Sequence, residues 1–322
     1  MLQYDYITIS FHKTIIILPN FGIIFPNRGV RQMLEVDSKG YEYRKWSGGI
    51  TFPVSVALCD IESQCNKSFV CHWHDGIEII AVTEGRIEHI VNGESYIMGA
   101  GDVMFVNSGS MHEGRAVDNG EGKYFALSFL VSLLSPEESG RVAEKYFGDT
   151  MSNGSIPHLY LPQGSAASEK IIEICTAICG YQHRREPCYE LYIKSELFRL
   201  WAILCKEASR VGVERKPDAS VERVKIAVEY IEENYRNKIS LEDISAACKI
   251  SKSELYRSFK RVMKRTPIDY VVDFRMRRSM LLLDKGASVT EAAMSSGFFD
   301  SSYYTKMFKR YVGCTPREYL RK

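Results

Sequence analysis

The chain has 322 residues, of which 45% are hydrophobic and 25% charged, and its net charge is +2 at pH 7. This length suffices for two or three domains with separate cores, and the composition excludes a low-complexity or fibrous chain. From Pro217 onward there are 21 Lys and Arg against 14 Asp and Glu, whereas the preceding part carries 21 against 26. A basic C-terminal part behind an acidic N-terminal part is typical of a nucleic-acid-binding unit joined to another domain.

The cysteines and the apolar runs indicate a cytoplasmic protein. The nine cysteines are an odd number, lie mostly within apolar runs and form no CxxC pair, which favours reduced thiols over disulfides or a thiolate zinc site. The apolar run at 14–25 is broken by Pro19 and is shorter than the about 20 residues that span a bilayer. It also lacks the cationic leader and cleavage site of a signal peptide, so we expect no membrane partner.

Residues 1–40 are rich in β-branched side chains and have few landmarks. They are consistent with an extra strand or an extended arm. A second interpretation is that Met33 is the natural start, and a third, which rests on the family resemblance described below, is a mobile arm that contacts the C-terminal part. The sequence alone leaves all three open.

Residues 41–165 predict an antiparallel β-barrel of the cupin or jelly-roll type, or a related sandwich. Short apolar runs alternate with turn residues every eight to twelve positions, with no helical pattern between them. Asn92-Gly93 separates two of these runs and is a strong hairpin signal, because both central positions of that turn favour positive φ. The clearest runs are residues 78–82, 86–91, 95–98, 103–106 and 124–129.

Three histidines and a glutamate in this region could form one cluster. On a single strand, His72, His74 and Glu78 would share a face, and His112 on a paired strand could complete the set. Three imidazoles and a carboxylate suit a divalent transition metal such as Zn, Mn, Fe or Ni, although no cofactor is certain. A free coordination position would make the metal a ligand-polarising or catalytic centre. We expect His89 to be an ordinary strand residue.

The spacing of these residues carries a family resemblance. His72 to Gly85 fits the pattern HxH, three residues, Glu, six residues, Gly. Gly101 to His112 fits Gly, five residues, Pro-x-Gly, two residues, His, except that Asn107 replaces the proline. Both motifs resemble those of the cupin superfamily, which implies a β-barrel. The resemblance leaves open a metal site, a metal-free effector pocket lined by His72, His74, Glu78 and His112, or merely structural histidines.

Residues 166–212 predict two helices that pack or pair. One starts near Ser168, and the other runs from Tyr189 to Ala208 after the break at Pro187. They either cover the barrel or face a second subunit, and a symmetric dimer would double the DNA contacts. Residues 213–220 contain proline and charge without apolar periodicity and read as a linker. The apolar stripe of the second helix is Leu191, Leu197, Phe198, Trp201, Leu204 and Cys205, interrupted by Lys194.

Residues 221–322 contain an internal duplication. The segment 259–270 recurs 49 residues later at 308–319, with Phe, Lys, Arg, Thr, Pro and Tyr at the same places. Each copy ends a short helix, tight turn and second helix, which is the helix-turn-helix plan. The first unit has helices at 241–248, capped by Ser240, and after Ser251; the second has helices at 289–296 and 302–309. We expect an amphipathic helix at 221–235, a connecting helix at 267–284, and a final helix after Thr315-Pro316.

These features extend over about 100 residues and form a specific pattern. They are Ile250-Ser251, Leu255, Arg257, Phe259-Lys260, Thr266-Pro267, Tyr270, Arg275, Gly297-Phe298, Asp300, Ser302-Tyr303, Phe308-Lys309, Gly313, Thr315-Pro316 and Tyr319. The pattern closely resembles the DNA-binding domain of the AraC/XylS family of bacterial transcription regulators. A cupin-like sensor ahead of this domain is the usual arrangement in that family, so the two resemblances support each other.

The resemblance implies that the second helix of each unit enters the major groove. Arg257 suits a bidentate guanine contact and Glu254 could accept from cytosine, whereas the hydroxyls of the second unit discriminate less. Lys260 and Lys309, with Arg261 and Arg310, are expected on phosphates, which position but do not specify. The base-reading candidates are Ser253, Glu254, Tyr256 and Arg257 in the first unit, and Ser301, Ser302, Thr305 and Lys306 in the second.

Three positions depart from the family pattern. Ser245 replaces an alanine, and Lys249 and Lys264 replace glycines. None of them removes a core residue, so we expect at most modest changes in turn geometry.

The sequence therefore predicts a cytoplasmic regulator of transcription that binds double-stranded promoter DNA as a homodimer. A small-molecule effector in the barrel, sugar-like among the candidates, would control it, and RNA polymerase would be a partner of an activator. The competing interpretation is a metal-dependent cupin enzyme, an isomerase or oxygenase, fused to a DNA-binding tail. A third is a regulator without an effector, whose barrel serves only dimerisation.

Overall fold

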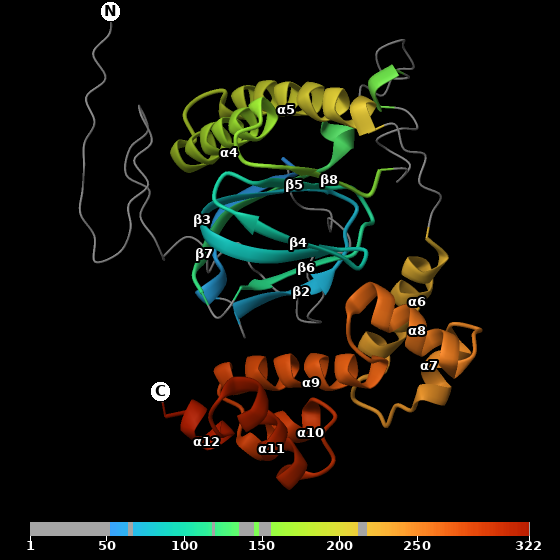
Figure 1. Cartoon of the computed structure of the whole chain (residues 1–322). Coiled ribbons are helices and arrows are strands. Elements are labelled where there is room, and N and C mark those ends of the chain that lie inside the picture. Colours follow the sequence, from blue (N-terminus) through green and yellow to red (C-terminus); the bar gives the residue numbers. More distant parts are fainter. Residues whose placement is uncertain are drawn as a thin grey trace, which may run out of the picture.

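The computed structural model describes residues 52–63, 67–117, 120–134, 145–147, 156–211 and 218–321. The predicted arm at 1–40 and most of the predicted linker lie outside these residues. Figure 1 shows a β-barrel in the middle, a pair of helices over one side of it and a helical domain on the other. The fold class predicted from the sequence, an antiparallel barrel followed by an all-α domain, is confirmed.

The described residues of the barrel form eight antiparallel strands. One sheet has the order β1-β7-β3-β5-β8, and β3 also pairs with β4 and β6, which in turn pairs with β2. The long strand β3 thus belongs to both halves of the barrel. The strands are β1 (Val54–Asp60), β2 (Ser68–His72), β3 (Ile77–Val91), β4 (Glu94–Gly99), β5 (Val103–Val106), β6 (His112–Ala116), β7 (Gly122–Phe129) and β8 (His158–Leu161), with short 3₁₀ turns η1 (Ile61–Ser63) and η3 (Val131–Leu133).

Strand β3 corrects one prediction. The runs at 78–82 and 86–91 are one strand, bent where the pairing with β7 shifts between Val82 and Glu84. Gly85 follows the bend with φ +66°, and a Cβ there would lie 2.0 Å from the carbonyl oxygen of Glu121. Only glycine fits this close approach, so the backbone bends without interrupting the pairing.

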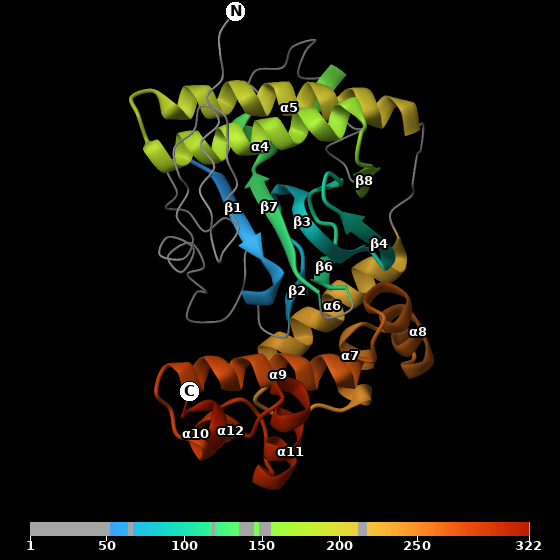
Figure 2. The ribbon, with the colours of Figure 1, turned by 60° about the vertical axis from the view of Figure 1, so that its left-hand side comes forward.

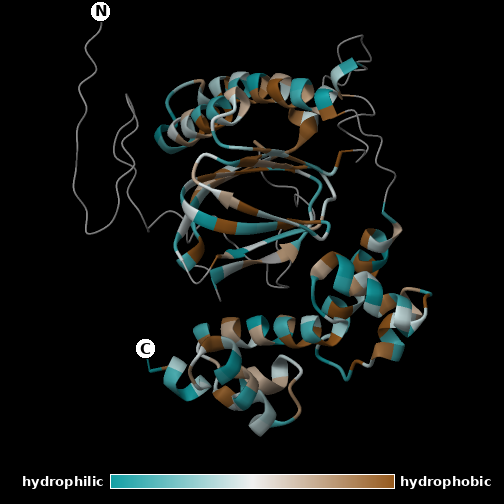
Figure 3. Cartoon of the chain, viewed as in Figure 1, coloured by the Kyte–Doolittle hydropathy of each residue, from teal (hydrophilic) through white to brown (hydrophobic). Residues whose placement is uncertain are grey.

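Helices α4 (Ala166–Arg184) and α5 (Tyr189–Val211) pack side by side over the sheet that contains β1 and β7 (Figure 2). Helix α4 starts earlier than predicted, because Ser165 caps it by accepting from the backbone N–H of Ser168. Hydrophobic residues of both helices and of the sheet gather between them (Figure 3). The predicted stripe of α5 is wrong at Leu191 and Phe198, which are 66% and 48% exposed, because Ile193 and Leu200 form the buried face with Leu197, Trp201 and Leu204.

The C-terminal domain contains two helix-turn-helix units joined by one long helix. Ser240 and Asp243 form the reciprocal capping box that the sequence predicted, and Thr266, predicted as a cap, forms a second box with Asp269. Leu255 and Phe259 of the first unit are fully buried. The helices are α6 (Ala219–Asn234), α7 (Leu241–Ala247), α8 (Lys252–Met263), α9 (Pro267–Asp284), α10 (Val289–Ser295), α11 (Ser301–Val312) and α12 (Pro316–Tyr319).

The residues that depart from the family pattern fit this geometry. Lys249 and Lys264 adopt the left-handed conformation, with φ of 54° at both positions, as glycine would. Ser245 is buried and its hydroxyl donates to the carbonyl of Glu242 at 3.0 Å. The two lysines therefore keep a turn conformation open to glycine, and Ser245 is accommodated inside α7.

The barrel packs directly on the first unit. Cys71, Trp73 and Met111 of the barrel belong to the same hydrophobic cluster as residues of α6, α8 and α9. The hairpin between β3 and β4 approaches so closely that a Cβ on Gly93 would lie 2.2 Å from the carbonyl oxygen of Arg261. In Figure 1 the long helix α9 runs beneath the barrel, with α10, α11 and α12 on its far side.

The predictions of reduced thiols and of no membrane-spanning segment can be compared with the described residues only. Their eight cysteines are all free thiols. None of the described helices has the length and hydropathy needed to cross a bilayer.

Candidate functional site

The four residues of the predicted cluster come together inside the barrel. Each offers one ligand atom, and these atoms all lie within 4.8 Å of one another. His72, His74 and Glu78 do not share the one strand that the sequence had predicted, whereas His112 does lie on a strand paired with that of His72. His72 ends β2, His74 lies in the following loop, Glu78 is the second residue of β3 and His112 begins β6.

Backbone carbonyls orient two of the imidazoles. Nδ1 of His74 lies 2.8 Å from the carbonyl oxygen of Gly76, and Nδ1 of His112 lies 2.9 Å from that of Ser110. Both Nε2 atoms face Glu78 Oε2, at 3.5 Å and 2.6 Å. A carbonyl on one ring nitrogen fixes the tautomer that leaves the other nitrogen as a metal ligand.

The cluster is largely buried, and yet Glu78 within it is ionised. Burial would raise the pKa of Glu78, but its contacts with His112 and His74 outweigh this and hold the pKa well below the usual range. Burial lowers the pKa of His74, but Glu78 and the carbonyl of Gly76 overcome this and raise it. Glu78 is therefore a carboxylate, the form that can bind a cation.

His89 lies in strand β3, as expected from the sequence, and its side chain also lies next to the cluster. It is fully buried beside the cluster, with its ring centroid 6.0 Å from that of His112, and neither ring nitrogen has a hydrogen-bond partner. Burial lowers its pKa to about 3, so the ring is neutral. Phe69 lies against both histidines and against Tyr124, and it occupies barrel space next to the cluster.

The motif glycines are explained by backbone geometry. Gly85, Gly101 and Gly109 all have positive φ, where only glycine avoids strain. Asn107, which replaces the motif proline, is buried, donates from its side chain to the carbonyl of Ile156 at 2.9 Å and accepts from the backbone N–H of Ser108 at 2.8 Å. Its side chain thus stabilises the turn ahead of His112.

The second helix of each unit, α8 or α11, exposes one polar face. Leu255 and Phe259 of α8, and Tyr304 and Phe308 of α11, are fully buried. The candidates Ser253, Tyr256, Arg257 and Lys260 are exposed on α8, as are Ser301, Ser302, Lys306 and Lys309 on α11. Asp300 caps α11 by accepting from the backbone N–H of Tyr303 at 2.8 Å.

Two of the candidates are occupied by contacts within the domain. Glu254 forms an ion pair with Arg223 of α6, so its carboxylate is not free in this conformation. The hydroxyl of Thr305 donates to the carbonyl of Ser301 at 2.8 Å. Neither contact was visible in the sequence, because the first joins residues far apart in the chain and the second depends on a rotamer.

Comparisons with known proteins agree with this architecture. The model of the AraC-like ligand binding domain matches residues 59–201, and that of a helix-turn-helix domain matches residues 244–322. The chain belongs to the AraC family of transcription regulators. Its barrel is the ligand-binding domain of an AraC-type protein, and its C-terminal helices are the DNA-binding domain.

Relatives match over most of the AraC-type chain. An uncharacterized HTH-type transcriptional regulator of Bacillus subtilis, YdeC, is 28% identical over 271 residues, which cover 84% of this chain and 92% of the relative. The HTH-type transcriptional activator RhaS of Escherichia coli is 24% identical over 278 residues, covering 83% and 93%. Among solved structures, ToxT of Vibrio cholerae has a TM-score of 0.45 at 14% identity, covering 84% of this chain and 97% of that one.

Proposed function

We propose that the chain recognises promoter DNA by placing α8 and α11 in the major groove, with Arg257 and Lys306 as the principal base-contacting side chains. The observation that supports this is the repeated geometry of the two helices. Each has a buried aromatic side on the domain core and an exposed face of hydroxyl and cationic side chains. Lys260 and Lys309 lie one turn further along these faces and bind phosphates.

Mapping of DNA bound by the chain in cells tests this proposal. Sequence-specific recognition predicts a shared motif beneath the bound sites, and the neighbouring genes would indicate the effector. A chain with Arg257→Ala and Lys306→Ala should retain folding but lose the motif. Bound sites without any common motif would contradict the proposal.

We further propose that His72, His74, Glu78 and His112 hold a divalent transition metal, and that this is the effector site of the barrel. Donor atoms at 2.0–2.1 Å from a zinc ion are at most about 4.2 Å apart. The atoms of this cluster lie within 4.8 Å, so the widest pairs would move inward on binding, whereas Glu78 Oε2 and His112 Nε2, now 2.6 Å apart, would separate. A bound metal would neutralise the buried carboxylate of Glu78, and a free coordination position would bind an oxygen or nitrogen atom of a small molecule.

Metal analysis of protein purified without a histidine tag tests the site. We expect about one equivalent of metal in the wild type and a loss of most of it in His74→Gln. His183, a histidine outside the barrel, provides the matched control His183→Gln. Equal metal in His74→Gln and the wild type would contradict the site.

The function that we propose is regulatory and not enzymatic. The four-residue cluster is the one observation that favours the alternative, a metal-dependent enzyme joined to a DNA-binding domain. Turnover of a sugar or diketone by the metal-loaded chain would support that alternative. Stabilisation of the chain by a metabolite without turnover would support an effector site.

We also propose that the chain acts in the cytoplasm as a homodimer, with the exposed side of α5 as the subunit interface. Leu191, Tyr192 and Phe198 are 66%, 53% and 48% exposed on this helix. Leu191→Glu combined with Phe198→Glu should shift the mass measured by sedimentation toward the monomer, without loss of helix content. A dimer that persists in this variant would place the interface elsewhere.

A further inference from the structure

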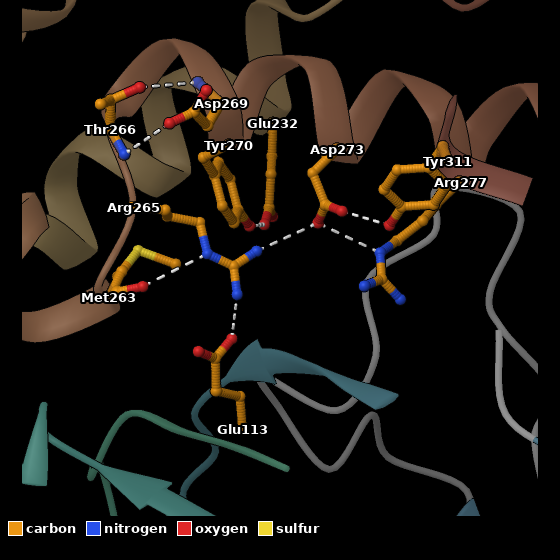
Figure 4. A network of polar contacts seen from close by, with 10 residues as sticks. All are labelled: Glu113, Glu232, Met263, Arg265, Thr266, Asp269, Tyr270, Asp273, Arg277 and Tyr311. Atoms are coloured by element: carbon orange, nitrogen blue, oxygen red, sulfur yellow. Dashed lines mark hydrogen bonds and ion pairs between the residues drawn. The ribbon is translucent and has the colours of Figure 1, made fainter. Parts of the chain in front are cut away.

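Beyond their shared apolar cluster, the barrel and the DNA-binding domain are joined by a partly buried polar network (Figure 4). Arg265, in the turn between α8 and α9, donates to Glu113 of strand β6. The side chains of Glu113 and Arg265 are 9% and 25% exposed, so water screens this ion pair little. Burial raises the pKa of Glu113, while the facing Arg265 and Arg115 oppose the shift.

The network continues from Arg265 to the second helix-turn-helix unit. Arg265 also contacts Asp273 of α9, at 3.4 Å between Nη1 and Oδ2. Asp273 accepts from the hydroxyl of Tyr311 on α11 and from Nε of Arg277, the latter at 3.2 Å. Glu113 of the barrel is thus connected through Arg265 to Asp273 of α9, and through Asp273 to Tyr311 of α11.

Two short segments, residues 71–74 and 111–113, contribute side chains both to the histidine cluster and to the contact with the DNA-binding domain. His112 faces the cluster, whereas its neighbours Met111 and Glu113 contact the DNA-binding domain. Between His72 and His74, the side chain of Trp73 lies in the apolar cluster shared with α6 and α8. Because neighbouring residues of an extended chain point to opposite sides, a shift of His112 or His74 moves the residues that touch the DNA-binding domain.

We propose that the Glu113–Arg265 contact transmits occupancy of the histidine cluster to both recognition helices. This inference rests on the proposed metal site for its natural input. If His112 moved to coordinate a metal, Glu113 on the same strand would move with it. Arg265 would then adjust its contact with Asp273, and the placement of α11 relative to α8 would change. A ligand shifts such an equilibrium only by its differential affinity for the two arrangements, so the response is measurable as a ratio of DNA affinities.

The docking step can be tested without metal. The chain has three tryptophans, and 5-fluorotryptophan labelling gives each a ¹⁹F signal, with Trp73 assigned by Trp73→Phe. Arg265→Met should shift or broaden the Trp73 signal in the full chain. Arg261→Met is the matched control, because the ion pair of Arg261 is with Asp218, the N-cap of α6, and not with a barrel residue. An unchanged Trp73 signal in Arg265→Met would overturn the role of this contact in docking.

The transmission step is tested by DNA affinity with and without Zn²⁺. We expect the affinity of the wild type to change about fivefold or more, which is the lower end of usual allosteric coupling. The ratio should fall to about one in Glu113→Gln and persist in the matched variant Glu88→Gln, since Glu88 pairs with Arg115 within the barrel. Tyr311→Phe should reduce the ratio in part, because it removes one link to α11.

The outcomes separate the coupling from the metal site. Bound Zn²⁺ without any change in DNA affinity, or a wild-type ratio in Glu113→Gln, would overturn the coupling and leave the metal site standing. If the wild type binds no metal, the metal site is wrong and His74→Gln replaces it as the input. The coupling then requires that His74→Gln alters DNA affinity and that Glu113→Gln abolishes this effect; any other result overturns it.

Discussion

The two helix-turn-helix units share a plan but differ in what surrounds them. The core of the first unit includes residues of α6 and of the barrel, among them Trp73 and Met111. The core of the second unit is formed by α9, α10, α11 and the residues that follow, without a barrel residue in the cluster. The first unit is therefore the one placed to sense the barrel directly, whereas the second receives that influence through α9.

The turns of the two helix-turn-helix units also differ in what surrounds them. Lys249 and Gly297 occupy corresponding turns and both have positive φ, but only the first carries a side chain. A Cβ on Gly297 would lie 2.3 Å from the carbonyl oxygen of Tyr235, in the segment that joins α6 to α7. The turn of the second unit therefore packs tightly against the end of α6. The two turns share a backbone conformation, but their surroundings differ.

The largest effects are expected from the two equivalent core aromatics. Phe259→Ala and Phe308→Ala should each cost about 3–5 kcal/mol of local stability, because both rings are fully buried. Native-state hydrogen exchange should show loss of protection in α10 to α12 for Phe308→Ala. For Phe259→Ala the loss should extend to α6 and the barrel edge near Trp73. Identical patterns for the two variants would contradict the difference between the cores.

The turns offer the next test. Gly297→Ala should destabilise the chain by more than the about 1–2 kcal/mol of left-handed strain, because the added Cβ also meets backbone. Lys249→Ala keeps a side chain at the same type of conformation and should stay within about 0.5 kcal/mol of the wild type. Thermal unfolding of both variants measures the contrast. Equal stability of the two would show that the second turn is not packed as described.

Helices α8 and α11 should differ in how strongly they discriminate between base pairs. Arg257→Ala should lower the preference at one base pair by roughly 1–3 kcal/mol, because a bidentate guanine contact is lost. Lys306→Ala should cost less, since a lysine binds as a point charge. Competition with duplexes that carry single base changes measures both. Larger discrimination lost in Lys306→Ala than in Arg257→Ala would reverse the order of the two helices.

The smallest expected effect concerns phosphate contacts. Lys309→Ala should weaken binding to all sequences alike and reduce the slope of log affinity against log salt by about 0.9. Titrations at several salt concentrations test this, with preferred and scrambled duplexes as the pair of ligands. A loss confined to the preferred duplex would mean that Lys309 reads bases.

Local signals in the sequence were the most reliable. The capping residues Ser240 and Thr266 and the cluster spacing each depend on a few neighbouring positions, and the structure contains all of them. The buried stripe predicted for α5 is wrong at two positions, because apolar residues occur on two sides of that helix. The partner of Arg265 was not predictable, since Glu113 lies 152 residues earlier and no local pattern links them.

Selection of bound duplexes from a randomised pool would show whether α8 and α11 both read DNA and whether α8 reads it more sharply. We expect two blocks of preferred bases about one helical turn apart, because paired recognition helices enter successive major grooves. Arg257→Ala should erase a position in the more informative block, and Lys306→Ala should weaken the other. A single block, or an unchanged profile in Arg257→Ala, would contradict this expectation.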